Sequence, residues 1–277
     1  MEVCVLASGS GGNAVYISDG STSVLLDVGL TVRKIQERLE TIGRRPEDID
    51  ALLLSHEHSD HISGVGPFSR RAKAPLWCAE AVKQTALARH GELSDVRTFV
   101  PGQPFQLGTL SVQPFSVPHD AVDPVCFVVT AGSVSVGVVT DLGTPTQLVR
   151  QKLRQCQLVV LEFNHDPDLL KQSSYPWRTK QRILSRVGHL SNESASELLA
   201  GVVHPGLRRV VLAHLSEKNN HPELARMHAE QALGAGAAVQ VAVASQHVPT
   251  PLYELPHTQA LPVSLFGPAL AAPLPTS

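Results

Sequence analysis

The chain has 277 residues, of which 43% are hydrophobic, so it can form one large domain with a substantial core. Its formal charge of −2 provides no general attraction to nucleic acid, and a phosphate-bearing partner would have to be held by local groups. The four cysteines are far apart and form no C-x-x-C pair, which argues against a zinc knuckle or a disulfide framework. We expect all four to be reduced core residues: Cys4, Cys78, Cys126 and Cys156.

The sequence shows neither a secretory signal nor a membrane span. The apolar run after Met1 is short and lacks the basic residues that precede a signal-peptide core. No later segment has the roughly 20 uninterrupted apolar residues that a spanning helix needs. We therefore expect a cytoplasmic protein that does not enter a membrane.

The first part of the chain alternates short β-type runs with turns. Three strands are predicted there: 2–7, 14–18 and 23–27. Apolar residues then recur at helical spacing over 31–41. The apolar run at 51–54 predicts a buried strand that leads directly into Ser-His-Glu-His-Ser-Asp-His.

Strands and helices recur in a second, similar succession after this point. Helical patterns are found at 62–72, 80–89, 145–155, 176–201 and 222–233. β-type runs are found at 75–78, in several segments between 97 and 139, at 158–161 and at 209–213. This order suits two sheets packed face to face with helices outside, and we predict an α/β fold with four layers in the order αββα.

The composition changes beyond Ser245. Seven of the 20 prolines lie between 249 and 275, and Glu254 is the only Asp, Glu, Lys or Arg residue after Ser245. We predict a folded domain over 1–245 and a largely disordered, proline-rich tail over 246–277. The leucine, phenylalanine and tyrosine residues of the tail leave room for a docking segment.

Four potential metal ligands lie within six positions after the predicted strand at 51–54: His56, His58, Asp60 and His61. The two members His56 and His58 share one face of an extended segment, whereas the other two follow a turn and point elsewhere. The spacing thus offers two ligands to each of two neighbouring metals. Because two-metal sites hold a hydroxide between the ions as nucleophile, the pattern predicts hydrolysis. The alternative is an exposed polar loop.

Three isolated residues of ligand type follow other predicted strands: His119, Asp141 and His214. Each alone is typical of a capping or solvent-exposed residue. Because parallel positions on the rim of a sheet converge on one site, their common placement predicts that they complete the metal site.

The H-x-H-x-D-H pattern followed by isolated His, Asp and His resembles the metallo-β-lactamase superfamily over approximately residues 2–233. The resemblance implies two sets of metal ligands joined by a bridging carboxylate: His56, His58 and His119 for one metal, Asp60, His61 and His214 for the other, and Asp141 for both. It also implies that Asp27 supports the ligand loop, although a turn-forming role before Gly29 explains it equally well. The cofactors would be two divalent ions, zinc or manganese, since histidine and aspartate sites accept both.

Other segments resemble one branch of this superfamily more specifically: LASGSGGNA, EFNHD and GHLSNESASELLA. They are similar to the YycJ or WalJ branch, whose members are regarded as DNA exonucleases, and GHLS is also similar to tRNA 3′-processing ribonucleases. This resemblance implies phosphodiester hydrolysis of DNA, with Asp60 and His189 as catalytic residues. In those ribonucleases the matching histidine is a proton-donor candidate, which assigns His189 to the leaving oxygen. A helix-flanking surface position is the alternative for His189.

The same segments contain candidates for substrate binding. A glycine-containing loop can bind anions through its backbone amides, and a helix start after Ser191 offers free N–H groups to a phosphate. Turn formation and helix capping are the alternatives. The candidates are Ser8, Ser10, Asn13, Asn164, His165, Ser191 and Asn192.

A group of basic residues precedes His189 and can track a nucleic-acid backbone: Arg178, Lys180, Arg182 and Arg186. The neighbouring Tyr175 and Trp177 can stack on a terminal base. A solvated helix face is the alternative interpretation of this group.

Two other functions remain open from the residues. A small-molecule hydrolase of the same fold, acting on a thioester, lactone or cyclic phosphodiester, would use the same ligands but would need a compact apolar pocket. A protein without catalysis would bind nucleotide or metal only. The hypothesis of a nucleotide-binding protein is weak, because the Gly-Ser-Gly-Gly loop lacks the G-x-G-x-x-G motif and is followed by a β-type run. Complete ligand sets argue against the metal-binding form.

Overall fold

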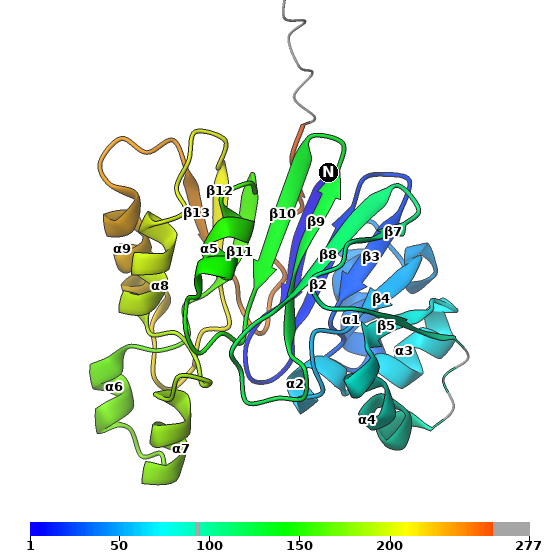
Figure 1. The fold of residues 1–277 in the computed structure, drawn as a ribbon, viewed down its shortest axis with the longest axis horizontal. Coiled ribbons are helices and arrows are strands. Elements are labelled where there is room, and N and C mark those ends of the chain that lie inside the picture. Colours follow the sequence, from blue (N-terminus) through cyan, green and yellow to red (C-terminus); the bar gives the residue numbers. More distant parts are fainter. Residues whose placement is uncertain (92, 94, 257–277) are drawn as a thin grey trace, which may run out of the picture.

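A computed structural model of the chain describes residues 1–91, 93 and 95–256. Two seven-stranded sheets pack face to face, and helices cover their outer faces (Figure 1). The predicted αββα sandwich is therefore confirmed. Within the described residues, no helix is long and apolar enough to cross a membrane.

The first sheet is formed mainly by the N-terminal half of the chain. Its strand order is β14-β1-β2-β3-β4-β5-β6. Strands β14 to β3 pair antiparallel and β3 to β6 pair parallel. The strands are β1 (Glu2–Ala7), β2 (Ala14–Ser18), β3 (Ser23–Leu26), β4 (Ala51–Leu53), β5 (Leu76–Ala79), β6 (Val96–Phe99) and β14 (Tyr253–Glu254).

The second sheet repeats this plan with the order β13-β12-β11-β10-β9-β8-β7. Strands β7 to β10 pair antiparallel and β10 to β13 pair parallel. The strands are β7 (Phe105–Leu107), β8 (Leu110–Ser116), β9 (Val125–Ala131), β10 (Val134–Val139), β11 (Leu158–Glu162), β12 (Arg209–Ala213) and β13 (Gln240–Val243).

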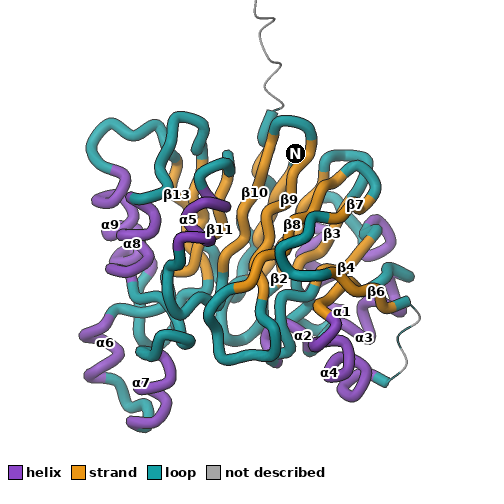
Figure 2. The backbone as a smooth tube through the Cα atoms, viewed as in Figure 1, coloured by secondary structure: helices purple, strands orange, loops and turns teal. Residues whose placement is uncertain are grey.

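Helices α1, α3 and α4 cover the first sheet, and α5, α8 and α9 cover the second (Figure 2). Two further helices, α6 and α7, project beyond the sandwich at the end where the short helix α2 lies (Figure 1). The helices are α1 (Val32–Glu40), α2 (Ser59–Ile62), α3 (Val65–Ala72), α4 (Glu80–His90), α5 (Gln147–Leu153), α6 (Pro167–Gln172), α7 (Trp177–Ile183), α8 (Asn192–Ala200) and α9 (Pro222–Leu233).

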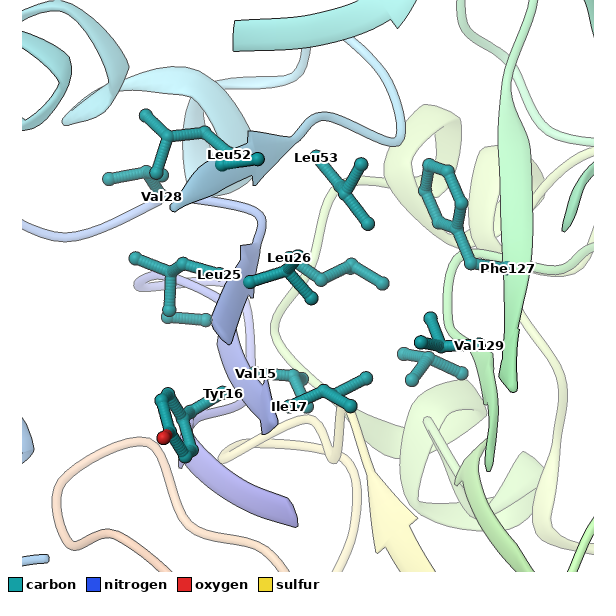
Figure 3. Packing of buried hydrophobic residues seen from close by; sticks show 14 of the residues in the cluster. Val15, Tyr16, Ile17, Leu25, Leu26, Val28, Leu52, Leu53, Phe127 and Val129 are labelled. Atoms are coloured by element: carbon teal, nitrogen blue, oxygen red, sulfur yellow. The ribbon is translucent and has the colours of Figure 1, made fainter. Parts of the chain in front are cut away.

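The main core lies between the two sheets. Because side chains alternate along a strand, every second residue of β2, β3 and β4 faces the other sheet. Four of them point toward Phe127 and Val129 of β9 (Figure 3): Val15, Ile17, Leu26 and Leu53. Their neighbours point to the opposite, helix-covered side: Tyr16, Leu25 and Leu52.

The 176–201 segment, predicted as mostly helical, contains two helices separated by a loop. Helix α7 ends at Ile183, and α8 begins at Asn192 with Ser191 as its N-cap. The intervening loop carries His189. The spacing of apolar residues in this segment does not indicate where the first helix ends. The loop between the helices brings His189 to the rim of the second sheet.

The segment after Ser245 packs on the domain as far as Pro256. Strand β14 pairs with β1, and Tyr253 and Leu255 are buried in the main core. Thr250 accepts hydrogen bonds from the backbone N–H of Val5 (3.0 Å) and, through its carbonyl, from Cys4 Sγ (3.2 Å). Residues 246–256 thus belong with the folded domain, in contrast to the predicted boundary at 245/246, and the rest of the predicted tail lies outside the described residues.

Candidate metal centre

The seven predicted metal ligands come together at one rim of the sandwich. They follow the ends of strands β4, β8, β10 and β12 or lie on α2, which begins directly after the β4 loop. Their ligand atoms form two groups, each with all atoms within 4.8 Å of one another: His56, His58 and His119, and Asp60, His61, Asp141 and His214. These are the two sets that the resemblance implied.

In the first group, three imidazoles converge from two loops. His119 Nε2 lies 3.2 Å from His58 Nδ1, and the opposite nitrogen of His119, Nδ1, donates to the carbonyl of Gly188 at 3.1 Å. His56 Nδ1 contacts Ser55 Oγ at 2.9 Å. In both His119 and His56, Nδ1 is thus held by a hydrogen bond and Nε2 is left for the group. This arrangement is typical of histidine metal ligands.

In the second group, two carboxylates alternate with two imidazoles. Asp60 Oδ2 lies 3.3 Å from His61 Nε2 and 3.4 Å from His214 Nε2. Asp141 Oδ2 lies 3.1 Å from His61 Nε2, whereas its Oδ1 lies 3.7 Å from both His119 Nε2 and His214 Nδ1. Asp141 therefore faces both groups, which is the placement that a bridging carboxylate needs.

The buried charges of the cluster favour ionised carboxylates. Burial alone would raise the pKa of Asp141, but His214 and His61 hold it well below its usual range. Burial would likewise lower the pKa of His214, but Asp141 and Asp60 raise it to about 9. The cluster is thus a buried, polarised site whose acidic groups attract positive charge.

The donor set fits divalent metal. His56 Nε2 and His214 Nδ1 are buried and find no hydrogen-bond partner among the described residues. A buried nitrogen without a partner is costly unless another group binds its lone pair. Imidazole and carboxylate ligands suit zinc and manganese, and the described residues thus support divalent metal binding.

Asp27 holds the ligand loop from below. Its Oδ2 accepts hydrogen bonds from His61 Nδ1 (2.8 Å) and Ser55 Oγ (2.9 Å), and its Oδ1 accepts from the Ser55 backbone N–H (2.9 Å). Asp27 is almost fully buried. It therefore orients His61 in the way that the resemblance implied, and Ser55, which the sequence did not single out, completes this support.

The backbone at the rim is strained at three site residues. Asp27, Asp141 and His214 have φ angles of 60°, 59° and 54°. Residues other than glycine adopt this left-handed conformation at an energetic cost, and they do so mainly where function or packing demands it. The turn that it forces at each strand end aims these side chains at the cluster.

The loop after β1 supports the ligands from the side. Ser8 Oγ accepts from the His214 backbone N–H at 2.7 Å. Asn13 Nδ2 lies 3.2 Å from Asp60 Oδ2 and 3.1 Å from His61 Nε2. Ser8 and Asn13 are buried, so we assign them to positioning the ligands in place of the predicted contact with substrate.

Four further candidates for substrate binding lie around the start of α8. Asn164 Nδ2 donates to the His214 carbonyl (2.8 Å), and the fully buried Asn192 exchanges hydrogen bonds with Asn220 (2.9 Å). His165 is also buried, which lowers its pKa to about 4. Ser191 caps α8 by accepting from the Ser194 N–H. Burial or capping accounts for these residues, and a substrate contact is not needed to explain them.

His189 is held beside the cluster by a buried carboxylate. Its Nδ1 donates to Glu162 Oε1 at 3.0 Å and lies 3.8 Å from Asp141 Oδ1. Glu162 is fully buried at the end of β11 and also accepts from the Leu142 and Leu190 backbone N–H groups. The sequence did not single out Glu162, although an acidic residue at the end of an apolar strand was a usable signal.

A cleft of about 220 Å³ opens over the cluster. Every residue that lines it is polar: Ser10, His58, Ser59, Asp60, Asp141, Arg182, His189 and His214. Of the predicted substrate-binding residues, Ser10 lines the cleft. His189, with one ring nitrogen bound to Glu162, can present the other to a molecule in the cleft.

An αββα sandwich with this cluster at its rim defines a metal-dependent hydrolase. The model of the beta-lactamase superfamily domain matches residues 22–215, and the chain belongs to this superfamily. It is 36% identical over 260 residues to the exodeoxyribonuclease WalJ of Streptococcus pneumoniae, covering 91% of this chain and 97% of the relative. It is 32% identical over 257 residues to the exodeoxyribonuclease YycJ of Bacillus anthracis, covering 90% and 97%.

The fold is also similar to solved structures. The metallo-beta-lactamase fold protein YhfI from Bacillus subtilis aligns with a TM-score of 0.69 and 18% identity, covering 90% of this chain and 98% of that protein. At this identity the similarity shows the fold alone.

Proposed function

We propose that the protein is a metal-dependent DNA exonuclease that hydrolyses phosphodiester bonds. The observation that supports this proposal is the Glu162–His189 hydrogen bond, which holds the His189 imidazole at the mouth of the ligand cluster. The relatives named exodeoxyribonucleases, aligned over nine-tenths of the chain, support DNA as the substrate.

Seven residues would hold two divalent ions, zinc or manganese: His56, His58, His119, Asp60, His61, His214 and the bridging Asp141. When bound, such a pair supplies a nucleophile at neutral pH and stabilises charge on the phosphate. Asp60 and Asp141 provide the negative charge that the ions require.

His189 would protonate the leaving oxygen. The Glu162 carboxylate accepts a hydrogen bond from Nδ1 and fixes the ring. In the imidazolium form, Nδ1–H remains bound to Glu162 and Nε2 carries the second proton, which passes to the leaving oxygen and leaves a neutral imidazole. A DNA alkoxide is a poor leaving group, and protonation by a positioned acid makes its departure easier. Glu162 then stabilises the ring through its charge and orients it without touching the substrate.

The lining of the cleft favours a phosphodiester over the thioester and lactone alternatives. A thioester or lactone hydrolase needs apolar surface for the acyl group. All residues that line this cleft are polar, and Arg182 adds a guanidinium that can pair with a phosphate oxygen.

The test is digestion of end-labelled DNA by protein loaded with Mn²⁺ or Zn²⁺. We expect single nucleotides to be released from linear DNA, whereas closed circular single-stranded DNA should resist cleavage. RNA of the same sequence and the Asp141→Asn variant serve as controls. Hydrolysis of a thioester or lactone without cleavage of any nucleic acid would overturn the proposal.

A further inference from the structure

Helices α6 and α7 form an arm over residues 167–188 that projects beyond the sandwich (Figures 1 and 2). Arg182 of this arm lines the cleft. Its buried side chains, those of Leu170 and Lys180, belong to neither hydrophobic cluster of the sandwich. The arm therefore adds little to the core, and its position next to the reacting groups calls for another explanation.

Polar contacts fix the arm in place. Lys180 Nζ donates to the Lys171 carbonyl at 2.6 Å, which joins α7 to α6. Thr144 Oγ1 donates to the Arg186 carbonyl at 2.8 Å, and the Asp120 N–H donates to the Val187 carbonyl at 3.0 Å. The arm is thus a fixed surface, and Lys180, which the sequence grouped with the basic residues, is used to build it.

Three arginines follow one another along the arm toward the cleft. Arg178 and Arg182 are one helical turn apart on the same face of α7, and Arg186 lies in the loop before His189. Arg182 lines the cleft and pairs with Asp120. Arg178 and Arg186 are exposed and form no ion pair within the described part of the chain.

An aromatic residue stands next to this line. The Trp177 residue is 66% exposed, more than any other large hydrophobic residue that the structure describes. Tyr175 is only half-exposed and already faces the ammonium of Lys218, 5.5 Å from the ring centre. Trp177 is therefore the more accessible of the two rings.

We propose that a single DNA strand entering the cleft lies along this arm, with its phosphates on Arg178, Arg182 and Arg186 and a base stacked on Trp177. The proposal rests on the proposed nuclease function and adds the substrate path. Charge complementarity identifies the occupant, because the chain as a whole is slightly acidic, whereas Arg178 and Arg186 carry exposed charges on either side of Arg182 that no described acidic residue pairs. A single strand fits because its unpaired bases can stack on an aromatic ring.

Binding is tested separately from cleavage with a fluorescein-labelled, phosphorothioate-linked dT20, which resists hydrolysis. Trp177→Ala is expected to weaken binding roughly tenfold, within the range for the loss of one base stack, and Trp177→Phe should restore most of it. Arg178→Ala with Arg186→Ala should lower the salt dependence of log K by about 0.7 for each phosphate that the variant no longer binds. The double variant Arg178→Lys with Arg186→Lys should keep the salt dependence of the wild type.

The matched control is Arg33→Ala, which removes an arginine that is 85% exposed on helix α1 and belongs to neither the arm nor the cleft lining. It should leave affinity and salt dependence unchanged. If Trp177→Ala and the double arginine variant bind dT20 as the wild type does, the path is wrong, even where the wild type degrades DNA. If they bind weakly but the wild type cleaves no DNA, the path stands and the nuclease function fails.

Discussion

The Asp27 carboxylate accepts a hydrogen bond from His61 Nδ1 at 2.8 Å, beneath the ligand cluster. Because Asp27 can only accept, the proton lies on Nδ1 and the Nε2 lone pair is turned toward Asp60 and Asp141. A single buried contact thus decides which nitrogen of His61 is free to bind a metal.

Replacing Asp27 by Asn should therefore weaken metal binding. The amide can present its NH₂ group to Nδ1 and favour the wrong tautomer, and we expect a 10- to 100-fold loss of affinity, the usual range for such supporting residues. Competition against a chromogenic chelator measures it. Asp168→Asn, at an aspartate whose side chain is 79% exposed, is the control. Unchanged affinity in a folded Asp27→Asn protein would remove Asp27 from this role.

Asp141→Asn tests the bridge between the two groups. Its carboxylate has one oxygen near His61 and the other near His119 and His214, so the neutral amide should weaken both sets of contacts. We expect the metal content measured by mass spectrometry to fall and DNA cleavage to be abolished, with an unchanged circular dichroism spectrum. Full metal content and activity would contradict a bridging role.

The C-terminal segment should matter up to Pro256. Burial raises the pKa of the Cys4 thiol to about 11, and Thr250 covers it. A chain that ends at residue 245 should expose Cys4. Its thiolate fraction at pH 8 then rises by up to about two hundredfold, since a free thiol has a pKa near 8.5.

The measurement is reaction with Ellman's reagent under native conditions. A chain that ends at residue 256 is the matched control and should react as slowly as the full chain. Cys78 and Cys156, whose pKa values burial raises to about 12, should stay unreactive in all three proteins. Equal reaction of the 245 and 256 chains would show that the segment does not protect Cys4.

The sequence could predict the sandwich and the convergence of the ligands because both depend on local patterns. Apolar periods identify strands and helices, and residues such as His119 and Asp141 stand shortly after such strands. Since strand ends meet at a sheet rim, these local signals were enough to bring distant ligands together.

Contacts between distant segments explain what the sequence could not predict. Asn192 lies at a helix start of the kind that can bind phosphate, but its side chain is hydrogen-bonded to Asn220, 28 positions away. Strand β14 has two residues in a proline-rich segment and exists only because it pairs with β1 at the other end of the chain. No period in either segment indicates its partner.

His189→Ala should keep the metals and slow the chemical step. Loss of a general acid typically costs about 10²- to 10⁴-fold in rate. Single-turnover cleavage of end-labelled DNA measures the step, and metal analysis checks that the cluster is intact. Glu162→Gln should produce a smaller loss, because the ring of His189 remains but its orientation and charge partner change.

Two substrates with different leaving groups show whether His189 protonates the leaving oxygen or binds the substrate. A nitrophenyl phosphodiester expels a stable phenolate that hardly needs a proton, so its hydrolysis should fall far less than that of DNA. The same comparison applies to Glu162→Gln, whose effect on protonation passes through His189 and should again be larger for DNA than for the nitrophenyl ester, although both losses are smaller. If His189→Ala slows both substrates equally, the imidazole binds the phosphate and does not protonate the leaving oxygen. If Glu162→Gln slows only the nitrophenyl ester, the carboxylate does not act through His189, and the pair is structural.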